Sequence, residues 1–185
     1  MNRLQRMVVL TALCRRMREM GSLCGETHIQ KATYFLQTVA RIPLGFSFVL
    51  YRFGPFSFDL RDELIEMQAD DLLRPHPQGP YGPTISPTGR SEKIVSKFPV
   101  TLGRYGSAIA FVVDALGNRP AAALEQLGMA LYLKTAENLL DPVRIAGRLC
   151  EAKPYVSHDE GDRAARDMLA IFNAWDRRSH ASADL

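Results

Sequence analysis

Hydrophobic residues recur at helical spacing over the first 20 residues of the chain. Asn2 is a favourable N-cap and Gly21 a favourable stop, so the pattern predicts a first helix between them. Its inward positions would be Leu4, Met7, Val8, Leu10, Cys14 and Met17. A second helix is predicted from a cap at Thr27 to a point before Pro43, because proline disfavours helical geometry in the preceding residue. Its buried positions would be Ile29, Ala32, Phe35, Leu36 and Val39.

Residues 46–53 are dense in aromatic and β-branched side chains, which alternate between two faces and predict a strand. Gly54 and Pro55 then end the strand. Ser57 is placed to cap a third helix over about residues 58–72.

Residues 75–83 are rich in proline and glycine and lie between two short predicted strands, at 72–74 and 84–86. This pattern predicts a β-hairpin, or wing. After the wing the chain is helical, with prolines that punctuate the helices. The helices are predicted over residues 91–97, 103–116, 121–139, 142–152 and 157–175.

The order of these elements indicates an α+β, mainly helical protein, with a winged-helix front half, a small β-hairpin wing and a C-terminal helical bundle. We expect residues 1–92 to form the winged-helix part and residues 93–176 to pack on it as one continuous domain. Residues 177–185 are polar and predict a flexible tail. The segment 121–140 is apolar nearly all round, which predicts a helix in the core of the bundle, and a homodimer is a further expectation.

The three cysteines lack any Cys-x-x-Cys spacing, and the four histidines are widely separated. Neither a disulfide framework nor a metal site is therefore predicted. No apolar run approaches the ~20 residues of a membrane span, and the arginines near the N-terminus are unlike a secretory signal. We expect a cytoplasmic protein with no cofactor and no membrane association.

Charge is unevenly distributed, although the net charge is only +3. Residues 1–60 hold eight basic and three acidic residues, whereas the third helix carries six carboxylates and one arginine. A duplex would be repelled by that helix, so DNA would be met through the first helix and the wing. The candidate nucleic-acid contacts are Arg3, Arg6, Arg15, Arg16, Arg18, Arg74 and Arg90. A basic protein partner would instead use Asp59, Asp62, Glu63 and Glu66.

Two segments carry a family resemblance: residues 25–36, with Ile29-Gln30-Lys31, and residues 48–57, with Tyr51-Arg52-Phe53-Gly54-Pro55. Here the chain resembles bacterial proteins of the YwgA-like family and, more distantly, the Panacea-type antitoxin domain. The likeness covers about residues 22–92, with a fainter echo at residues 153–157. It implies a winged-helix-like fold, an antitoxin or adaptor role, and no catalytic residues.

The same segments contain a candidate polar cluster, formed by Gln30, Lys31, Tyr51, Arg52, Gly54 and Pro55. These residues either read a ligand or a nucleic-acid backbone, or join helix to strand structurally, with Lys31 extending past Tyr34 to solvent. The second interpretation is favoured, because Gly-Pro turns usually mark backbone geometry.

Enzymatic motifs are missing from the sequence, which has no glycine-rich phosphate loop and no Gly-x-Ser-x-Gly elbow. A metal-dependent hydrolase is therefore not expected. Two hypotheses remain: a non-enzymatic, DNA-associated regulator, or a protein-binding antitoxin-like or adaptor module in a toxin–antitoxin or phage-defence setting. The second would act through the acidic helix or the C-terminal helices.

Overall fold

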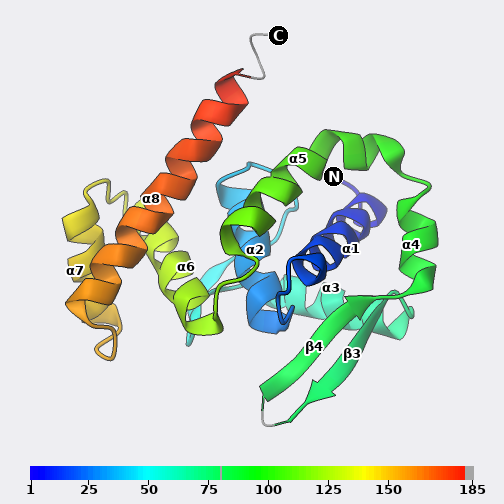
Figure 1. Ribbon diagram of the computed structural model, residues 1–185, viewed down its shortest axis with the longest axis horizontal. Helices are drawn as coiled ribbons and strands as arrows, with labels where there is room; N and C mark the ends of the chain where they lie inside the picture. Colours follow the sequence, from blue (N-terminus) through cyan, green and yellow to red (C-terminus); the bar gives the residue numbers. More distant parts are fainter. Residues whose placement is uncertain (80, 182–185) are drawn as a thin grey trace. The chain divides into compact units, whose positions relative to one another are not determined.

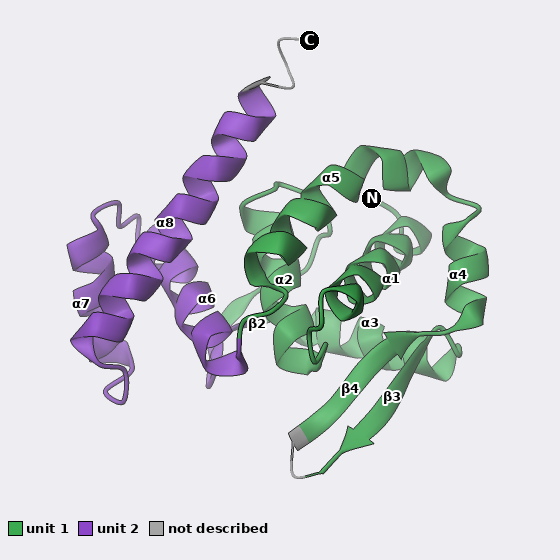
Figure 2. Ribbon diagram, viewed as in Figure 1, with its two compact units in different colours: residues 1–49, 56–119 green, residues 50–55, 120–185 purple. Residues whose placement is uncertain are grey.

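A computed structural model describes residues 1–79 and 81–181 of the chain. It is an α+β structure, mostly helical, with two small two-stranded sheets (Figure 1). Pro80 of the expected wing and residues 182–185 of the expected tail lie outside the described residues. The residues form two compact units, one of Met1–Val49 and Phe56–Arg119 and the other of Leu50–Pro55 and Pro120–Leu185 (Figure 2).

The first unit begins with α1 (Arg3–Glu19) and α2 (Glu26–Thr38). Asn2 caps α1 as predicted, through a reciprocal capping box with Gln5. Thr27 is not the cap of α2, because the N-cap is Gly25, two residues earlier, and Thr27 lies in the first turn of the helix. All five predicted inward positions of α2 are buried, whereas Leu4 of α1 is half exposed.

The third helix, α3 (Phe58–Ala69), begins at Ser57, whose Oγ accepts a hydrogen bond from the Leu60 amide at 3.2 Å. This confirms the predicted cap. The wing strands β3 (Leu73–Gln78) and β4 (Tyr81–Pro87) pair antiparallel, with Arg74 opposite Ser86 and His76 opposite Thr84. Between α1 and α2, Gly25 forms an isolated antiparallel bridge to Thr84.

The helices α4 (Gly89–Val95) and α5 (Pro99–Leu116) complete the first unit and pack against α1. They belong with the front half of the chain, so the boundary between the two units follows Arg119 rather than residue 92. The helix α5 begins at Pro99, and the N–H that proline lacks would have no intrahelical acceptor at this position.

The second unit contains α6 (Ala121–Ala136), α7 (Pro142–Ala152) and α8 (His158–Ala181), which pack on one another. The apolar residues of α6 lie in the core of this unit, as predicted; they are Leu124, Leu127, Met129, Leu131 and Leu133. Leu140, expected in the same buried segment, lies beyond the helix and is exposed. Residues 177–181, expected in a flexible tail, continue α8.

Candidate functional site

A short β-hairpin replaces the single strand expected at residues 46–53. Its strands are β1 (Val49–Tyr51) and β2 (Gly54–Phe56), and the chain reverses at Arg52 and Phe53. Gly54 has φ +80°, the left-handed conformation that glycine adopts most readily after a tight hairpin turn. Gly54 and Pro55 therefore do not end the strand but start its return partner.

The tip of this hairpin, Leu50–Pro55, groups with the second unit. Lys153, just after α7, donates a hydrogen bond from Nζ to the backbone carbonyl of Arg52. The same ammonium pairs with Glu125 of α6 at 2.9 Å, and the Tyr155 hydroxyl donates to that carboxylate. These contacts fix the tip against segments that are about 70–100 residues away in the sequence.

The Lys153–Glu125 pair is shielded, with side-chain exposures of 12% and 14%. Burial lowers the pKa of Lys153, but the hydrogen bond and charge of Glu125 outweigh burial and leave the pKa above its ordinary value. The ammonium therefore stays charged and keeps its hold on the Arg52 carbonyl over the whole physiological range.

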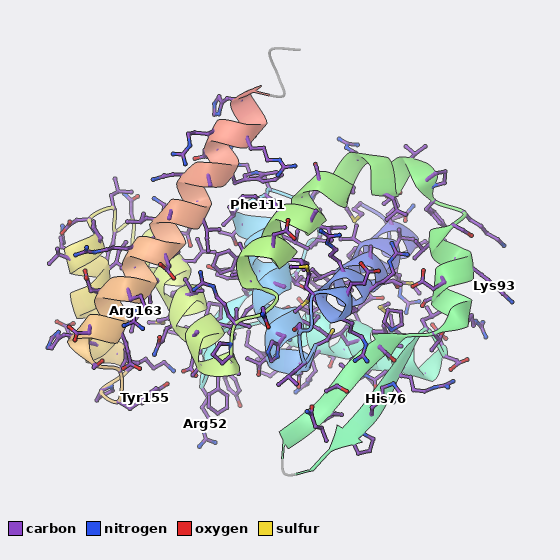
Figure 3. All side chains as sticks on the ribbon, in the orientation of Figure 1. Arg52, His76, Lys93, Phe111, Tyr155 and Arg163 are labelled. Carbon is purple, nitrogen blue, oxygen red and sulfur yellow. The ribbon has the colours of Figure 1, made fainter. Side chains whose placement is uncertain are left out.

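The hairpin tip and Tyr155, which both bond to this pair, carry exposed aromatic and apolar side chains. Leu50 is 44% exposed, Tyr51 and Phe53 are each 55% exposed, and Tyr155 is 68% exposed. The Arg52 guanidinium lies 5.4 Å from the Phe53 ring centroid. Figure 3 labels Arg52 and Tyr155. We call Leu50, Tyr51, Arg52, Phe53 and Tyr155 the hairpin patch.

Arg52 is the charged member of the hairpin patch. Across residues 1–79 and 81–181, no carboxylate lies within 4.0 Å of its guanidinium nitrogens. Arg52 is exposed, and a guanidinium that lies against an aromatic ring keeps its in-plane N–H donors free to bond other groups. Such an arginine can accept a carboxylate from another molecule without breaking an ion pair of its own.

The candidate nucleic-acid contacts are mostly neutralised within the first unit. Five of the seven arginines form ion pairs, so part of the expected basic face is engaged with the expected acidic face. The pairs are Arg3–Glu63 (3.0 Å), Arg6–Glu63 (3.1 Å), Arg15–Glu92 (2.8 Å), Arg16–Asp114 (3.3 Å) and Arg74–Asp71 (3.0 Å). Arg18 and Arg90 are exposed.

The acidic residues of α3 have different surroundings. Glu63 was expected to face outward, but it is buried and receives both Arg3 and Arg6 of α1. The two ion pairs compensate the Glu63 carboxylate for its loss of hydration, and this allows it to lie inward. Glu66 also pairs with Arg3, at 2.8 Å, while Asp59 and Asp62 remain on the exposed face of the helix.

The candidate polar cluster is divided between the two units. Gln30 and Lys31 lie in the first unit, and Tyr51, Arg52, Gly54 and Pro55 in the second. The Gln30 side chain forms two hydrogen bonds with the backbone of Ser57. It accepts from the Ser57 N–H and donates to the Ser57 carbonyl, each at 2.9 Å. Lys31 does not reach solvent as expected, since it is only 2% exposed.

Sequence reasoning missed Glu125, Lys153 and Tyr155 as site residues. The signal for two of them was the faint family likeness at residues 153–157, which the structure joins to the Tyr51-to-Pro55 segment through Lys153. Glu125 had no signal, because a single glutamate on a helix is ordinary.

Metal-binding groups and membrane-spanning helices were sought among the described residues. They contain no group of three or more His, Cys, Asp or Glu side chains placed to hold a metal ion. No helix within the described ranges has the length and apolar character needed to cross a bilayer. Comparison of the chain with protein-family models and with curated proteins found no match.

Proposed function

We propose that this chain is a non-enzymatic protein-binding module, antitoxin-like or adaptor-like, that recognises its partner through the hairpin patch. The observation that carries the proposal is the exposure of three aromatic rings and Leu50 around an arginine without a carboxylate partner in the described chain. Exposed apolar surface gathered in one place is typical of an interaction site, whereas scattered exposed residues are not.

The composition of the patch agrees with this role. Tyr, Phe and Arg are enriched in protein interfaces, and Tyr and Arg dominate the residues that contribute most binding energy. The Lys153–Glu125 pair holds the Arg52 backbone in place before binding. A surface ordered in advance loses less conformational entropy on association. The partner is expected to present a carboxylate for Arg52 beside apolar side chains.

A second candidate, the DNA-associated regulator, is supported by the arrangement of the first unit. In this proposal α1, α2, α3 and the β3–β4 wing form a winged helix, with Gly25 as a minimal first strand bridged to Thr84. The Ile85 amide also donates to the Cys24 carbonyl at 3.0 Å, which extends that pairing. The ion pairs of five candidate arginines favour protein binding over this alternative.

A comparison of two surface substitutions tests the proposal. Phe53→Ala removes an exposed ring from the hairpin patch, whereas Val143→Ala removes a 68% exposed apolar side chain from α7 of the same unit. We expect a partner retained by wild type and Val143→Ala to bind Phe53→Ala at least about tenfold more weakly, measured by titration of the purified pair. Equal affinity of all three proteins would exclude the hairpin patch.

The same wild-type protein should be titrated with duplex DNA over a salt series. The proposal predicts no binding at ~50 mM salt and micromolar protein, a regime in which basic DNA-binding domains associate. Tight, steeply salt-dependent binding that is lost in the Arg15→Glu, Arg16→Glu double variant would favour the regulator instead.

A further inference from the structure

We infer that the cleft between α1 and α5 binds a small organic anion, a carboxylate with an apolar body. This surface cleft has a volume of about 350 Å³ and lies wholly within the first unit. Its volume falls in the range of about 300–1,000 Å³ that is usual for small-molecule sites. The hairpin patch belongs to the other unit, so this inference does not depend on the proposed function.

Five of the residues that line the cleft are apolar, and we call them its floor. It is formed by Ala12 of α1 and by Leu102, Gly106, Ile109 and Ala110 of α5. A Cβ atom added at Gly106 would meet no atom within 4 Å, so the missing side chain contributes to the open space. An aromatic or branched aliphatic group would bury its surface here in place of water.

Two guanidinium groups and one carboxylate, from Arg15, Arg16 and Glu19 of α1, complete the lining. The Arg16 guanidinium donates one hydrogen bond within the described chain, from Nη2 to Asp114 at 3.3 Å, and its Nε is buried without a hydrogen-bond partner there. A guanidinium carries five N–H donors, and the Arg16 side chain is 42% exposed, so its solvent-facing donors can exchange water for a ligand oxygen. Arg15 donates from Nη1 to Glu92 at 2.8 Å and lies 3.9 Å from Glu19.

The charges around the cleft favour a ligand with a single negative charge. Glu19 and Asp114 are each 55% exposed and Glu92 is 39% exposed, so water screens their hold on the arginines. A ligand carboxylate with its body on the apolar floor would be less hydrated and would match the planar guanidinium of Arg16. Highly charged phosphates do not suit this site, because three carboxylates lie near its two arginines.

Naphthalene-2-carboxylate is a suitable probe, with naphthalene-2-methanol as its uncharged analogue. For a ligand of about 13 non-hydrogen atoms with the binding efficiency usual for drug-sized molecules, we expect a Kd of about 1 mM for the acid. Binding can be followed by ¹H–¹⁵N NMR titration of the full chain, in which the amides of Arg16, Leu102 and Ile109 should shift together. The alcohol should bind at least about tenfold more weakly, since it lacks the charge-assisted contact.

Two glycines of α5 provide a matched pair of variants. Gly106→Leu fills the cleft, whereas Gly103→Leu places the same side chain one turn earlier, outside the lining and also without a close neighbour. Both substitutions raise helix propensity, so both proteins should fold. We expect Gly106→Leu to weaken naphthalene-2-carboxylate at least about tenfold, Arg16→Gln to weaken it about tenfold, and Gly103→Leu to bind as wild type.

Several results would overturn the inference. They are the absence of saturable shifts in wild type up to about 10 mM probe, equal binding by Gly106→Leu and wild type, or equal binding of the acid and the alcohol. Shifts that map to the hairpin patch instead of α1 and α5 would also exclude the cleft. None of these outcomes bears on partner binding through Phe53.

Discussion

The turn of the β1–β2 hairpin depends on the backbone conformation of Gly54. Its φ of +80° lies in the left-handed region, which a β-branched residue adopts only with strain. We expect Gly54→Val to lower the free energy of unfolding by about 1–3 kcal/mol, because the strain falls only on the folded state. Urea unfolding would measure this change.

Gly54→Asn is the matched control, since asparagine tolerates the left-handed region better than other non-glycine residues. Its loss of stability should be smaller than that of Gly54→Val. Equal losses for the two variants would show that backbone strain is not the cause.

His28 of α2 contributes a pH dependence to the stability of the first unit. Burial lowers its pKa below the ordinary value of 6.5, and a hydrogen bond to the backbone of Arg119 opposes that effect only in part. The unfolded chain therefore takes up the proton at a higher pH than the folded chain does. Stability should fall as the pH drops from about 6.5 toward the lowered folded pKa.

His28→Gln removes this proton uptake. We expect the variant to lose less stability than wild type between pH 7.5 and about pH 5.5, measured by urea unfolding at both values. Identical losses in the two proteins would contradict the assignment of this pH dependence to His28.

At the scale of elements, two glutamines of α2 hold the chain that runs from α2 to α3. Gln30 bonds both backbone groups of Ser57, and Gln37, seven residues later on the same face, bonds both backbone groups of Phe46. The Gln30 contacts are buried, whereas those of Gln37 are partly buried. The two side chains take the place of a strand partner for this segment.

Replacement of either glutamine by leucine should lower the free energy of unfolding, and the more buried glutamine should cost more. Gln30→Leu leaves the buried Ser57 N–H without a partner, at a cost of about 1–3 kcal/mol. The Ser57 carbonyl loses one of its two donors but keeps the Arg61 amide, at 3.1 Å. Gln37→Leu should cost less, because water can reach the Phe46 groups. Thermal or urea unfolding of both variants would reveal the order, and a larger loss for Gln37→Leu would contradict this account.

These elements also show which features can be predicted from sequence. The caps at Asn2 and Ser57 and the bounds of α7 follow from local chemistry, and the structure confirms them. The β1–β2 hairpin was missed because strands of three residues give almost no alternation, and because Tyr51-to-Gly54 contains no Asn-Gly type of turn signal. The glutamine contacts were missed because they depend on tertiary structure.

At the scale of the molecule, the uneven charge distribution of the sequence is largely balanced inside the first unit. Arg3 and Arg6 of α1 meet Glu63 of α3 across 57–60 residues, and Arg15 meets Glu92 across 77 residues. The sequence predicted a basic face and an acidic face as separate surfaces. Some of their residues instead form ion pairs with each other inside the first unit. Sequence pattern could not predict this balance, because a surplus of charge in one segment does not show which segment it faces.

The hairpin patch was equally hidden in the sequence, because Lys153 reaches Arg52 across 101 residues. Its residues were present in the family-like segments, but their shared surface required the fold. We propose that this patch contacts a partner protein, and photo-crosslinking tests that proposal most directly.

The photo-reactive residue p-benzoylphenylalanine would replace Phe53 in one protein and Val143 in another, both expressed in full length in the source cells. We predict that irradiation links position 53 to one protein species, identified by mass spectrometry, while position 143 gives no such product. The same products from both positions, a product sensitive to nuclease, or none from position 53 would contradict the assignment of the hairpin patch as the partner-binding surface.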